Sequence, residues 1–463
     1  MKPVAIIGGG ITGLTAAFNL RQRGLPVALF ESDTRVGGVI RTVREDGYLA
    51  ECGPNTILDT SPVIGELIRD AGVEGRRLYS DPRAEKRYLV RDRQLVNLPT
   101  SPLAFLTSRL FSWRAKIGLM AEPFRRRSPA SAEESLAEFV LRRLGREFLD
   151  YAINPFVAGV YAGDPARLSV RHAFPKLHAL EQRHGSLIKG QILGARERKR
   201  RGTVSKQDAK KISFDNGLQV LTDALGEKLG DAVRLEHTVK KIRRDPEGWR
   251  IDFKEDAAGA SPGHSAVLLA LPAYVLAGLD ISHDDQRIDF SMLGEIEYPP
   301  VASVVLGFRR EDVEHSLDGF GVLIPEVERL FSLGAIFSSS LFPGRAPEGH
   351  VTLSSYVGGT RNPDLAYQDH AIICQRVLRD LRVLIGLKGQ PTFAHAHSFE
   401  RAIPQYNVGY GRFKTRMDAA EAEAPGLFLS GPFREGISLG DSIVAGQNVA
   451  ARIAKITNPD NEK

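Results

Sequence analysis

Short apolar runs alternate with a helical pattern at the start of the chain, and similar runs return much later. Val4 to Ile7 and Val27 to Phe30 predict buried strands, and apolar residues at helical spacing from Leu14 to Leu20 predict a helix that stops at Gly24. Further strands are predicted at Val233–Leu235, Val239–Ile242, Trp249–Phe253, Ala266–Leu271 and Gly426–Ser430, with a helix at Ser442–Ile456. The strand and helix pattern of the first residues therefore returns, after a long interruption, in two later segments.

Two insertions lie between these segments. The first, residues 97–211, has helical periods at Leu103–Leu110, Arg114–Glu122 and Glu134–Leu144. The second, Ile281 to His397, is rich in β-branched runs and predicts sheet. The expected class is α/β and α+β, with a Rossmann-like domain built from three segments, a mixed-sheet domain and a helical insertion.

Composition places the chain among ordinary globular proteins. Its 463 residues predict two to four compact units, with 42% apolar and 25% charged residues. The two cysteines, Cys52 and Cys374, lie far apart and outside any metal-binding spacing, which favours a reducing compartment and no metal site. No apolar run approaches the roughly 20 residues of a membrane-crossing helix, and the first strand begins too early for a signal peptide to precede it.

The basic charge is concentrated in the helical insertion. Residues 97–211 hold 22 Lys and Arg against 10 Asp and Glu, a surplus of 12, while the whole chain carries +6. The densest parts are Arg125–Arg127 and the run from Arg196 to Lys211. These cations are interpreted either as solvated helix faces or as a surface for an anionic membrane, where each contributes about 1 kcal/mol. The apolar residues of the insertion favour a membrane over nucleic acid: Phe105, Leu106, Leu110, Phe111 and Trp113.

The first predicted strand leads into a glycine-rich turn. Gly8, Gly10 and Gly13 form GxGxxG between a strand and a helix, and Glu31 ends the next strand 18 residues after Gly13. In this context Gly8 permits the turn, Gly10 lets a pyrophosphate approach, and Gly13 lets the helix pack on the sheet. The helix N-terminus then holds the anion, and Glu31 can accept hydrogen bonds from ribose hydroxyls. The pattern predicts a dinucleotide site.

The segment after Glu31 narrows the choice of dinucleotide. Arg35-Val36-Gly37-Gly38-Val39-Ile40-Arg41-Thr42 places two glycines and two arginines within reach of a diphosphate. It resembles the corresponding segment of the amine oxidase and phytoene desaturase class of flavoproteins. That resemblance implies FAD.

Further motifs, taken in order, narrow the resemblance. They are Glu51–Asn55, Gly159–Asp164, Phe214–Leu218, Ile403–Tyr406 and Glu435–Ile437. Together they resemble the protoporphyrinogen oxidase family, from Pro3 to about Ile453, and the stretches Leu333–Pro343 and Tyr356–Gly359 resemble its plant and Gram-negative type. The resemblance implies an FAD domain (1–80, 212–280 and 398–463), a substrate domain (81–96 and 281–397) and a basic, membrane-associating helical insertion (97–211).

The family pattern also implies roles for individual residues. Arg87 would pair with a substrate propionate, Leu323, Ile336 and Tyr356 would enclose the tetrapyrrole, and the Gly159 carbonyl would line the site near the oxidised carbon. The implied cofactor-binding residues are Gly8, Gly10, Thr12, Gly13, Glu31, Arg35, Gly37, Gly38, Arg41, Gly53, Pro54, Asn55, Val239, Gly431, Ile437, Ser438 and Asp441.

The chain departs from the family pattern at Ser438, Gly440 and Ser442, where a glycine, a variable residue and a cysteine are usual. The small side chains should preserve backbone contacts to the flavin ring. Because no cysteine lies in the final strand and helix, we expect the FAD to be noncovalent. The histidines show no catalytic or metal-binding spacing, and no general base is assigned.

The implied reaction is the oxidation of protoporphyrinogen IX to protoporphyrin IX by dioxygen, with six electrons leaving in three steps and three peroxides formed. Coproporphyrinogen III as substrate, another oxidase of the same class, and a membrane-surface protein that holds FAD without turnover stay open as alternatives. The expected partners are the porphyrinogen, dioxygen and an anionic membrane, with hand-off to ferrochelatase and a homodimer as further options. The expected location is cytoplasmic, peripheral on the inner face of the cell membrane.

Overall fold

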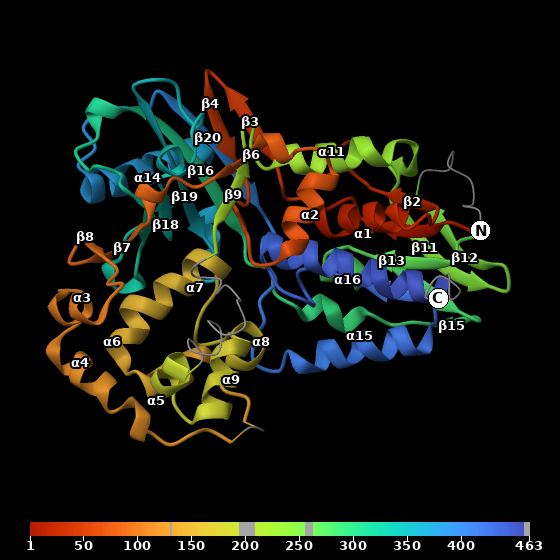
Figure 1. The fold of residues 1–463 in the computed structure, drawn as a ribbon, viewed down its shortest axis with the longest axis horizontal. Helices are drawn as coiled ribbons and strands as arrows, with labels where there is room; N and C mark the ends of the chain where they lie inside the picture. Colours follow the sequence, from red (N-terminus) through yellow and green to blue (C-terminus); the bar gives the residue numbers. More distant parts are fainter. Residues whose placement is uncertain (130–131, 194–208, 255–262, 458–463) are drawn as a thin grey trace.

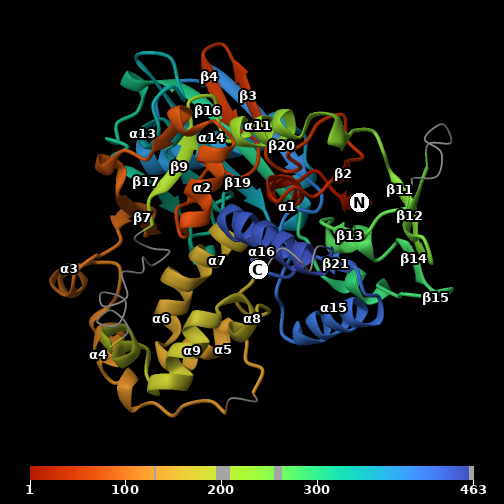
Figure 2. The same ribbon diagram turned by 45° about the vertical axis from the view of Figure 1, so that its right-hand side comes forward.

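The computed structural model describes residues 1–129, 132–193, 209–254 and 263–457. Three regions are visible in it: a sheet flanked by helices near both chain ends, a larger sheet, and a group of short helices (Figures 1 and 2). The densest basic run of the sequence, from Arg196 onward, falls largely outside the described residues.

A parallel sheet of five strands lies at the centre of the first region, in the order β10-β2-β1-β13-β21. Its strands are β1 (Val4–Ile7), β2 (Val27–Phe30), β10 (Val233–Arg234), β13 (Ala266–Leu269) and β21 (Leu427–Leu429). The strands come from three parts of the sequence, so the predicted assembly of one sheet from separated segments is confirmed.

Helices cover this sheet and bury its apolar residues. They are α1 (Ile11–Gln22), α2 (Pro62–Asp70), α11 (Gln219–Leu229), α12 (Ala273–Leu276), α15 (Gly411–Glu423) and α16 (Leu439–Thr457). Helices α1 and α16 run side by side (Figure 1), and their contact depends on small residues. A Cβ on Gly446 of α16 would lie 2.6 Å from the Thr12 carbonyl oxygen of α1, so a larger residue there would separate the helices.

Three smaller sheets are also present. One contains β11 (Val239–Asp245), β12 (Gly248–Phe253), β14 (Asp280–His283) and β15 (Gln286–Arg287). The others pair β3 (Thr42–Glu45) with β4 (Tyr48–Glu51), and β9 (Lys211–Phe214) with β5 (Ile57–Leu58) and β6 (Arg77–Tyr79).

The second region is a mixed sheet of seven strands in the order β20-β16-β19-β18-β17-β7-β8. Its strands are β7 (Lys86–Arg91), β8 (Gln94–Asn97), β16 (Val301–Arg309), β17 (Gly319–Leu323), β18 (Gly334–Ile336), β19 (His350–Gly358) and β20 (Phe393–Phe399), joined by helix α13 (Ser338–Leu341). The chain therefore enters the seven-stranded sheet only after β15, a few residues beyond the predicted boundary at position 280. The division into an FAD domain, a substrate domain and a helical insertion stays a prediction.

The predicted sheet of this region is confirmed by β16 to β20, with one correction. Helix α14 (His370–Ile385) also lies among these residues. The Asp369 carboxylate accepts hydrogen bonds from the Ala371 and Ile372 N–H groups and caps the helix. Ile373, Val377 and Leu381 recur every four residues and are buried against the sheet, a helical period within a segment that is otherwise β-branched.

The third region is the helical insertion, which lies below the seven-stranded sheet in Figure 1. It contains α3 (Pro102–Thr107), α4 (Trp113–Met120), α5 (Leu136–Arg143), α6 (Arg146–Phe148), α7 (Asn154–Tyr161), α8 (Val170–Ala173) and α9 (Pro175–His184). Its core includes charged groups: Arg143 is fully buried and its guanidinium pairs with Glu181 and Glu122, at 2.6 and 3.2 Å.

Candidate cofactor and substrate site

The glycine-rich turn after β1 has the geometry that a bound dinucleotide requires. Gly8 has a φ of +108°, and a Cβ there would lie 2.6 Å from the Ala270 carbonyl oxygen. A Cβ on Gly13 would overlap the Gly8 carbonyl, so the helix packs directly on the turn. A Cβ on Gly10, by contrast, meets no atom within 4 Å. The turn is closed on its protein side and open at Gly10, where a diphosphate would approach.

Helix α1 begins directly behind this opening. The first N–H groups of a helix have no acceptor within the helix and attract anions. The first turn of α1 contains no acidic residue, and Thr12 is buried within it. These residues therefore fit the phosphates of a dinucleotide.

Glu31 and Arg35 hold the loops of the site in place. Glu31 Oε2 accepts a hydrogen bond from Gly9 N–H at 2.6 Å, and Oε1 accepts one from Asp33 N–H at 2.9 Å. The Arg35 guanidinium donates to the carbonyl oxygens of Val36, Gly38 and Ile40 at 2.7–3.0 Å. Arg35 therefore shapes the Gly37–Gly38 loop, whereas Arg41 is exposed.

The remaining predicted cofactor residues lie around this turn. Gly37 N–H donates to the Gly9 carbonyl at 2.8 Å, and His237 N–H donates to the Glu31 carbonyl, which brings the start of β11 and Val239 beside β2. At the end of β21, Gly431 has a φ of +154° and donates its N–H to Glu435 at 2.8 Å. Ile437 is half-buried, and Ser438 Oγ accepts a hydrogen bond from Asp441 N–H at the start of α16.

The loop of Gly53, Pro54 and Asn55 joins the two sheets. The Tyr356 hydroxyl donates to the Gly53 carbonyl at 3.2 Å and also contacts the Asn55 amide. Burial raises the pKa of Tyr356 well above its ordinary value, so the phenol stays neutral. One predicted substrate residue therefore contacts two predicted cofactor residues.

The register of the seven-stranded sheet places the predicted substrate residues on one face. Leu323, Gly334 and Tyr356 are direct cross-strand neighbours, and Gly321 lies between Arg87 and Ile336 in the next row. Because direct neighbours and alternate residues of a strand share a face, Arg87, Leu323, Ile336 and Tyr356 all point the same way. We call this the site face. The opposite face packs on α14.

Helix α7 meets the site face at Gly159. A Cβ on Gly159 would overlap Leu323 Cδ2, so the helix backbone lies directly against the sheet side chain. The structure thus brings Gly159 together with residues that lie about 160 to 200 positions later in the chain.

A buried carboxyl, whose role the sequence did not indicate, lies behind the glycine loop. Glu51 accepts hydrogen bonds from the Thr42 hydroxyl at 2.7 Å and from Leu218 N–H at 2.8 Å. Burial raises the pKa of Glu51 to about 7, although these hydrogen bonds and nearby Arg345 lower it. In the sequence Glu51 follows a short apolar run, Tyr48–Ala50, and opens the family motif Glu51–Asn55, but neither feature indicated a buried carboxyl.

His395 and His397 lie at alternate positions of β20. His395 Nε2 lies 3.4 Å from Cys52 Sγ, and burial lowers the pKa of both imidazoles. Among the described residues, no group of three or more His, Cys, Asp or Glu is placed to hold a metal ion.

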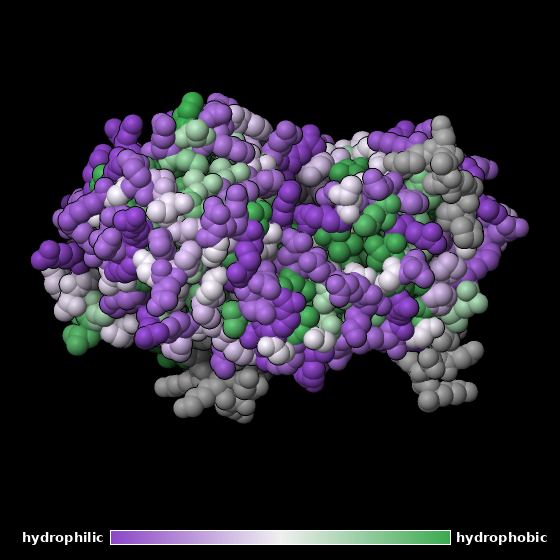
Figure 3. All heavy atoms as spheres, turned by 90° about the horizontal axis from the view of Figure 1, so that it is seen from above, coloured by the Kyte–Doolittle hydropathy of each residue, from purple (hydrophilic) through white to green (hydrophobic). Residues whose placement is uncertain are grey.

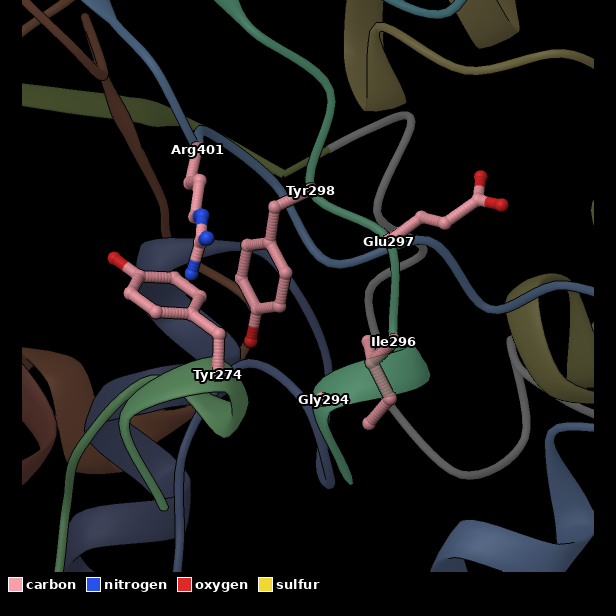
Figure 4. Close-up of a pocket in the computed structure, with 6 residues that line it drawn as sticks. All are labelled: Tyr274, Gly294, Ile296, Glu297, Tyr298 and Arg401. Atoms are coloured by element: carbon pink, nitrogen blue, oxygen red, sulfur yellow. The ribbon is translucent and has the colours of Figure 1, made fainter. Parts of the chain in front are cut away.

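A surface hollow of about 410 Å³ lies where the two sheets join (Figure 4). Arg401 stacks over the Tyr274 ring at 4.6 Å, Tyr274 meets Tyr298 edge to face at 5.0 Å, and Tyr298 accepts a hydrogen bond from Ala273 N–H. A second hollow, about 780 Å³, lies between α2 and α11. Neither hollow is lined by the predicted substrate residues.

Comparison with known proteins identifies the family. Residues 11–454 match the model of flavin-containing amine oxidoreductases. Protoporphyrinogen oxidase 2 of Arabidopsis thaliana is 35% identical, with 97% of this chain and 93% of the relative covered. Coproporphyrinogen III oxidase of Bacillus subtilis is 29% identical, with 96% of both chains covered.

Solved structures share the fold. A candidate protoporphyrinogen oxidase from Exiguobacterium sp. 255-15 has a TM-score of 0.81 at 24% identity, and a cyclohexylamine oxidase from Brevibacterium oxydans has one of 0.69 at 16% identity. Each comparison covers 98% of this chain, with 98% and 99% of the respective structures. The chain is an FAD-dependent oxidoreductase that belongs to the flavin-containing amine oxidoreductase family, among its porphyrinogen oxidases.

Proposed function

We propose that this protein oxidises protoporphyrinogen IX to protoporphyrin IX with dioxygen as the electron acceptor. The observation that carries the proposal is the site face, an apolar and aromatic surface with one arginine at its end and the cofactor loop Gly53–Asn55 at its other side. This surface matches a flat, largely apolar tetrapyrrole that carries carboxylates on one edge. The names of the plant relatives support the same substrate.

The residues of the chain bind and orient the substrate. Bound FAD supplies the chemistry, since flavins accept a hydride. Leu323, Ile336 and Tyr356 form an apolar surface for the macrocycle, and Gly159 lets the α7 backbone approach it closely. In the proposed overall reaction, three two-electron oxidations transfer six electrons to three molecules of dioxygen, which leave as three molecules of peroxide.

A feature near Arg87 favours protoporphyrinogen over coproporphyrinogen. Lys211 lies close enough to Arg87 for the guanidinium to lower its pKa, in addition to the larger effect of burial. The Glu85 carboxylate acts in the opposite direction on Lys211, so the two cations and one carboxylate lie near one another beside the site face. Protoporphyrinogen IX carries two neighbouring propionates, whereas coproporphyrinogen III carries four around the ring, so a one-sided pair fits the former. A carboxylate pairs well with a guanidinium because the hydrogen bonds are charge-assisted.

The experiment compares both porphyrinogens with the purified holoenzyme, following the fluorescence of the porphyrin product. A kcat/KM at least tenfold higher for protoporphyrinogen is expected. Preference for coproporphyrinogen would assign the alternative substrate. Under anaerobic conditions substrate should bleach the flavin, and air should restore its colour with release of peroxide. If neither porphyrinogen bleaches the flavin, the proposed porphyrinogen oxidation is contradicted.

We also propose that the helical insertion docks on an anionic membrane. Four apolar side chains at helical spacing form one exposed stripe. They are Trp113, Ile117 and Met120 of α4 and Phe124 of the following turn Glu122–Phe124, and each is 65–87% exposed. Leu103 and Leu106 of α3 are exposed as well, and Arg109, Arg114 and Arg126 are exposed between and beside them. Apolar residues bordered by cations are typical of helices that lie in a membrane interface.

Several residues expected to face the membrane are instead internal. Leu110 and Phe111 are buried, and the Phe148 ring stacks on the rings of Phe105 and Phe111. Arg125 is half-buried and donates to the carbonyls of Arg142 and Gly118. These side chains hold the insertion together, because their apolar surfaces and hydrogen bonds are used within it.

Within the described residues, none of the helices is both long and apolar enough to cross a membrane. The side of the molecule seen from above is mainly hydrophilic, with apolar residues in separate groups (Figure 3). The proposed location is the inner face of the cell membrane, reached from the cytoplasm. A homodimer and hand-off to ferrochelatase stay predictions.

The test is cosedimentation with vesicles that contain phosphatidylglycerol or only phosphatidylcholine. Replacing Trp113, Ile117 and Met120 by Ser should reduce binding to anionic vesicles at least tenfold, and high salt should weaken the binding of the unmodified protein. The matched control replaces Ile372 and Val383 of α14, exposed by 49% and 46%, and should bind normally. Equal binding by all proteins would contradict the proposed surface.

A further inference from the structure

Arg401 lies two residues beyond strand β20, and its guanidinium carbon is 4.6 Å from the centre of the Tyr274 ring. The side chain is exposed, and it forms no hydrogen bond or ion pair with any of the described residues. A guanidinium presents five N–H donors in one plane, and stacking on a ring covers its face but leaves this edge open. Arg401 therefore holds a charged set of donors in place without an acceptor.

Other arginines that stack on aromatic rings in this protein do have acceptors. Within the described ranges ten arginines lie over a ring, and nine of them also donate a hydrogen bond or form an ion pair. Arg412 is the best match to Arg401, because it lies over Phe413 at the same 4.6 Å, yet it pairs with Glu295. An anion from outside the chain would give Arg401 the acceptor that the other nine find within it.

The Arg401 guanidinium lines the surface hollow of about 410 Å³ where the two sheets join (Figure 4). The rings of Tyr274 and Tyr298 meet edge to face at 5.0 Å in its wall, and Ile296 adds an apolar side chain. Glu297 also lines the hollow, but its carboxylate points away from Arg401 in Figure 4 and is already held in an ion pair. The volume lies within the range of roughly 300 to 1,000 Å³ that is typical of small-molecule sites.

We propose that this hollow binds a small aromatic carboxylate. The carboxylate accepts two parallel hydrogen bonds from the edge of the Arg401 guanidinium, and the ring of the ligand packs against Tyr298 and Ile296. The unpaired guanidinium, held by one tyrosine ring in a hollow lined by a second, carries this inference. The residues of the site face do not line the hollow, so the inference does not depend on the choice of porphyrinogen.

A ligand in the hollow would connect the two sheets. Tyr274 belongs to α12, which follows β13, and the Ala270 carbonyl between them lies against Gly8 of the glycine-rich turn. Arg401 lies after β20, where the chain runs beside the segment that leads into β16. Because the hollow exists only when these segments are folded together, the ligand stabilises the folded protein by mass action.

The experiment titrates the FAD-loaded protein with sodium benzoate in a calorimeter, alongside acetate, which lacks the ring, and benzyl alcohol, which lacks the charge. Benzoate should bind once per chain, about tenfold or more tighter than either, and should raise Tm as its concentration increases. Arg401→Gln should weaken benzoate binding about tenfold or more, because a charge-assisted pair is lost. The FAD content of this variant should stay normal, since Arg401 forms no hydrogen bond with the described residues.

Two arginine variants serve as controls. Arg412→Gln removes a guanidinium stacked at the same distance, and Arg87→Gln removes the arginine of the site face, so both should bind benzoate normally. If Arg401→Gln binds benzoate as the unmodified protein does, or if Arg87→Gln binds it less well, the acid does not occupy the hollow and the proposal is overturned. Equal binding of benzoate and benzyl alcohol, or of benzoate and acetate, overturns it without any variant. Since no porphyrinogen is present, failure of the proposed function would leave these results unchanged.

Discussion

Gly159 of helix α7 lies directly against the Leu323 side chain of strand β17, with no room for a methyl group between them. The contact joins the helical insertion to the seven-stranded sheet at the site face. The contact joins the Gly159 backbone to the end of the flexible Leu323 side chain. A larger residue at position 159 would therefore displace the Leu323 side chain and leave the fold largely intact.

Gly159→Ala should therefore alter substrate binding more than stability. Overpacking of this kind typically costs about 1 to 3 kcal/mol, and we expect a KM increase of about tenfold, measured by steady-state kinetics. Leu323→Ala in the same chain should recover part of the loss. Gly118→Ala in α4 is the control, because its nearest neighbour is an arginine side-chain atom at 3.8 Å. A double variant no better than the single one would show that the two residues are not coupled.

Arg87→Ala should raise KM for protoporphyrinogen and change kcat little, because a carboxylate bound equally in ground and transition states contributes to KM alone. Loss of a charge-assisted hydrogen bond of about 1.5 to 3 kcal/mol corresponds to roughly a tenfold to 150-fold increase. Arg83→Ala, an exposed arginine paired with Asp81 in a nearby turn, should have no such effect. An unchanged KM with normal FAD content would place Arg87 outside the site, whereas a large loss in kcat alone would mean that it orients the substrate.

The buried Glu51 predicts a pH dependence of stability. Its pKa is raised from 4.5 to about 7 in the folded protein, so folding favours its protonated form. Its contribution to stability is complete below pH 4.5, falls as the pH rises through 7, and changes by about 3 kcal/mol across that window. Urea unfolding of the unmodified protein and of Glu51→Gln, measured between pH 5 and 8, should therefore give curves that differ with pH. Parallel curves would mean that Glu51 titrates normally.

Arg143→Met tests the buried charges of the helical insertion. Arg143 is fully buried and bonds Glu181 at 2.6 Å, while Glu122 also accepts hydrogen bonds from the Ser186 hydroxyl and the Leu187 N–H. Replacing Arg143 removes the cation that faces the buried Glu122 carboxylate, whereas Glu181 keeps its ion pair with Arg142. The loss at Glu122 should cost about 3 to 5 kcal/mol in the free energy of unfolding. Arg146→Met, at a largely exposed pair with Asp150, should cost under about 1 kcal/mol. Similar effects of the two variants would mean that the buried cluster contributes little.

The FAD should be released on denaturation. No cysteine occurs in the final strand and helix, where the chain has Ser438 and Ser442. Acid precipitation should therefore leave the yellow flavin in the supernatant, at about one per chain. Flavin retained in the washed pellet would contradict noncovalent binding.

The sequence alone determined the local features of the cofactor region. The strand, glycine turn and helix from Val4 to Gln22 were predictable because their signals, apolar period and glycine spacing, act over a few neighbouring residues. The same holds for Glu31 at the end of β2 and for the absence of a C-terminal cysteine. The order of the family motifs indicated the class of reaction.

Only the tertiary structure decided which distant residues share a surface. Arg87, Gly159, Leu323 and Tyr356 come from four elements, and the register of β7, β17, β18 and β19 places the three strand residues on one face. Burial decided the rest. Phe111 and Trp113 have similar local patterns, yet Phe111 is buried and Trp113 is 65% exposed. Phe111 packs against Phe148, which belongs to a later segment of the chain, and the spacing of apolar residues along the sequence does not reveal such a contact.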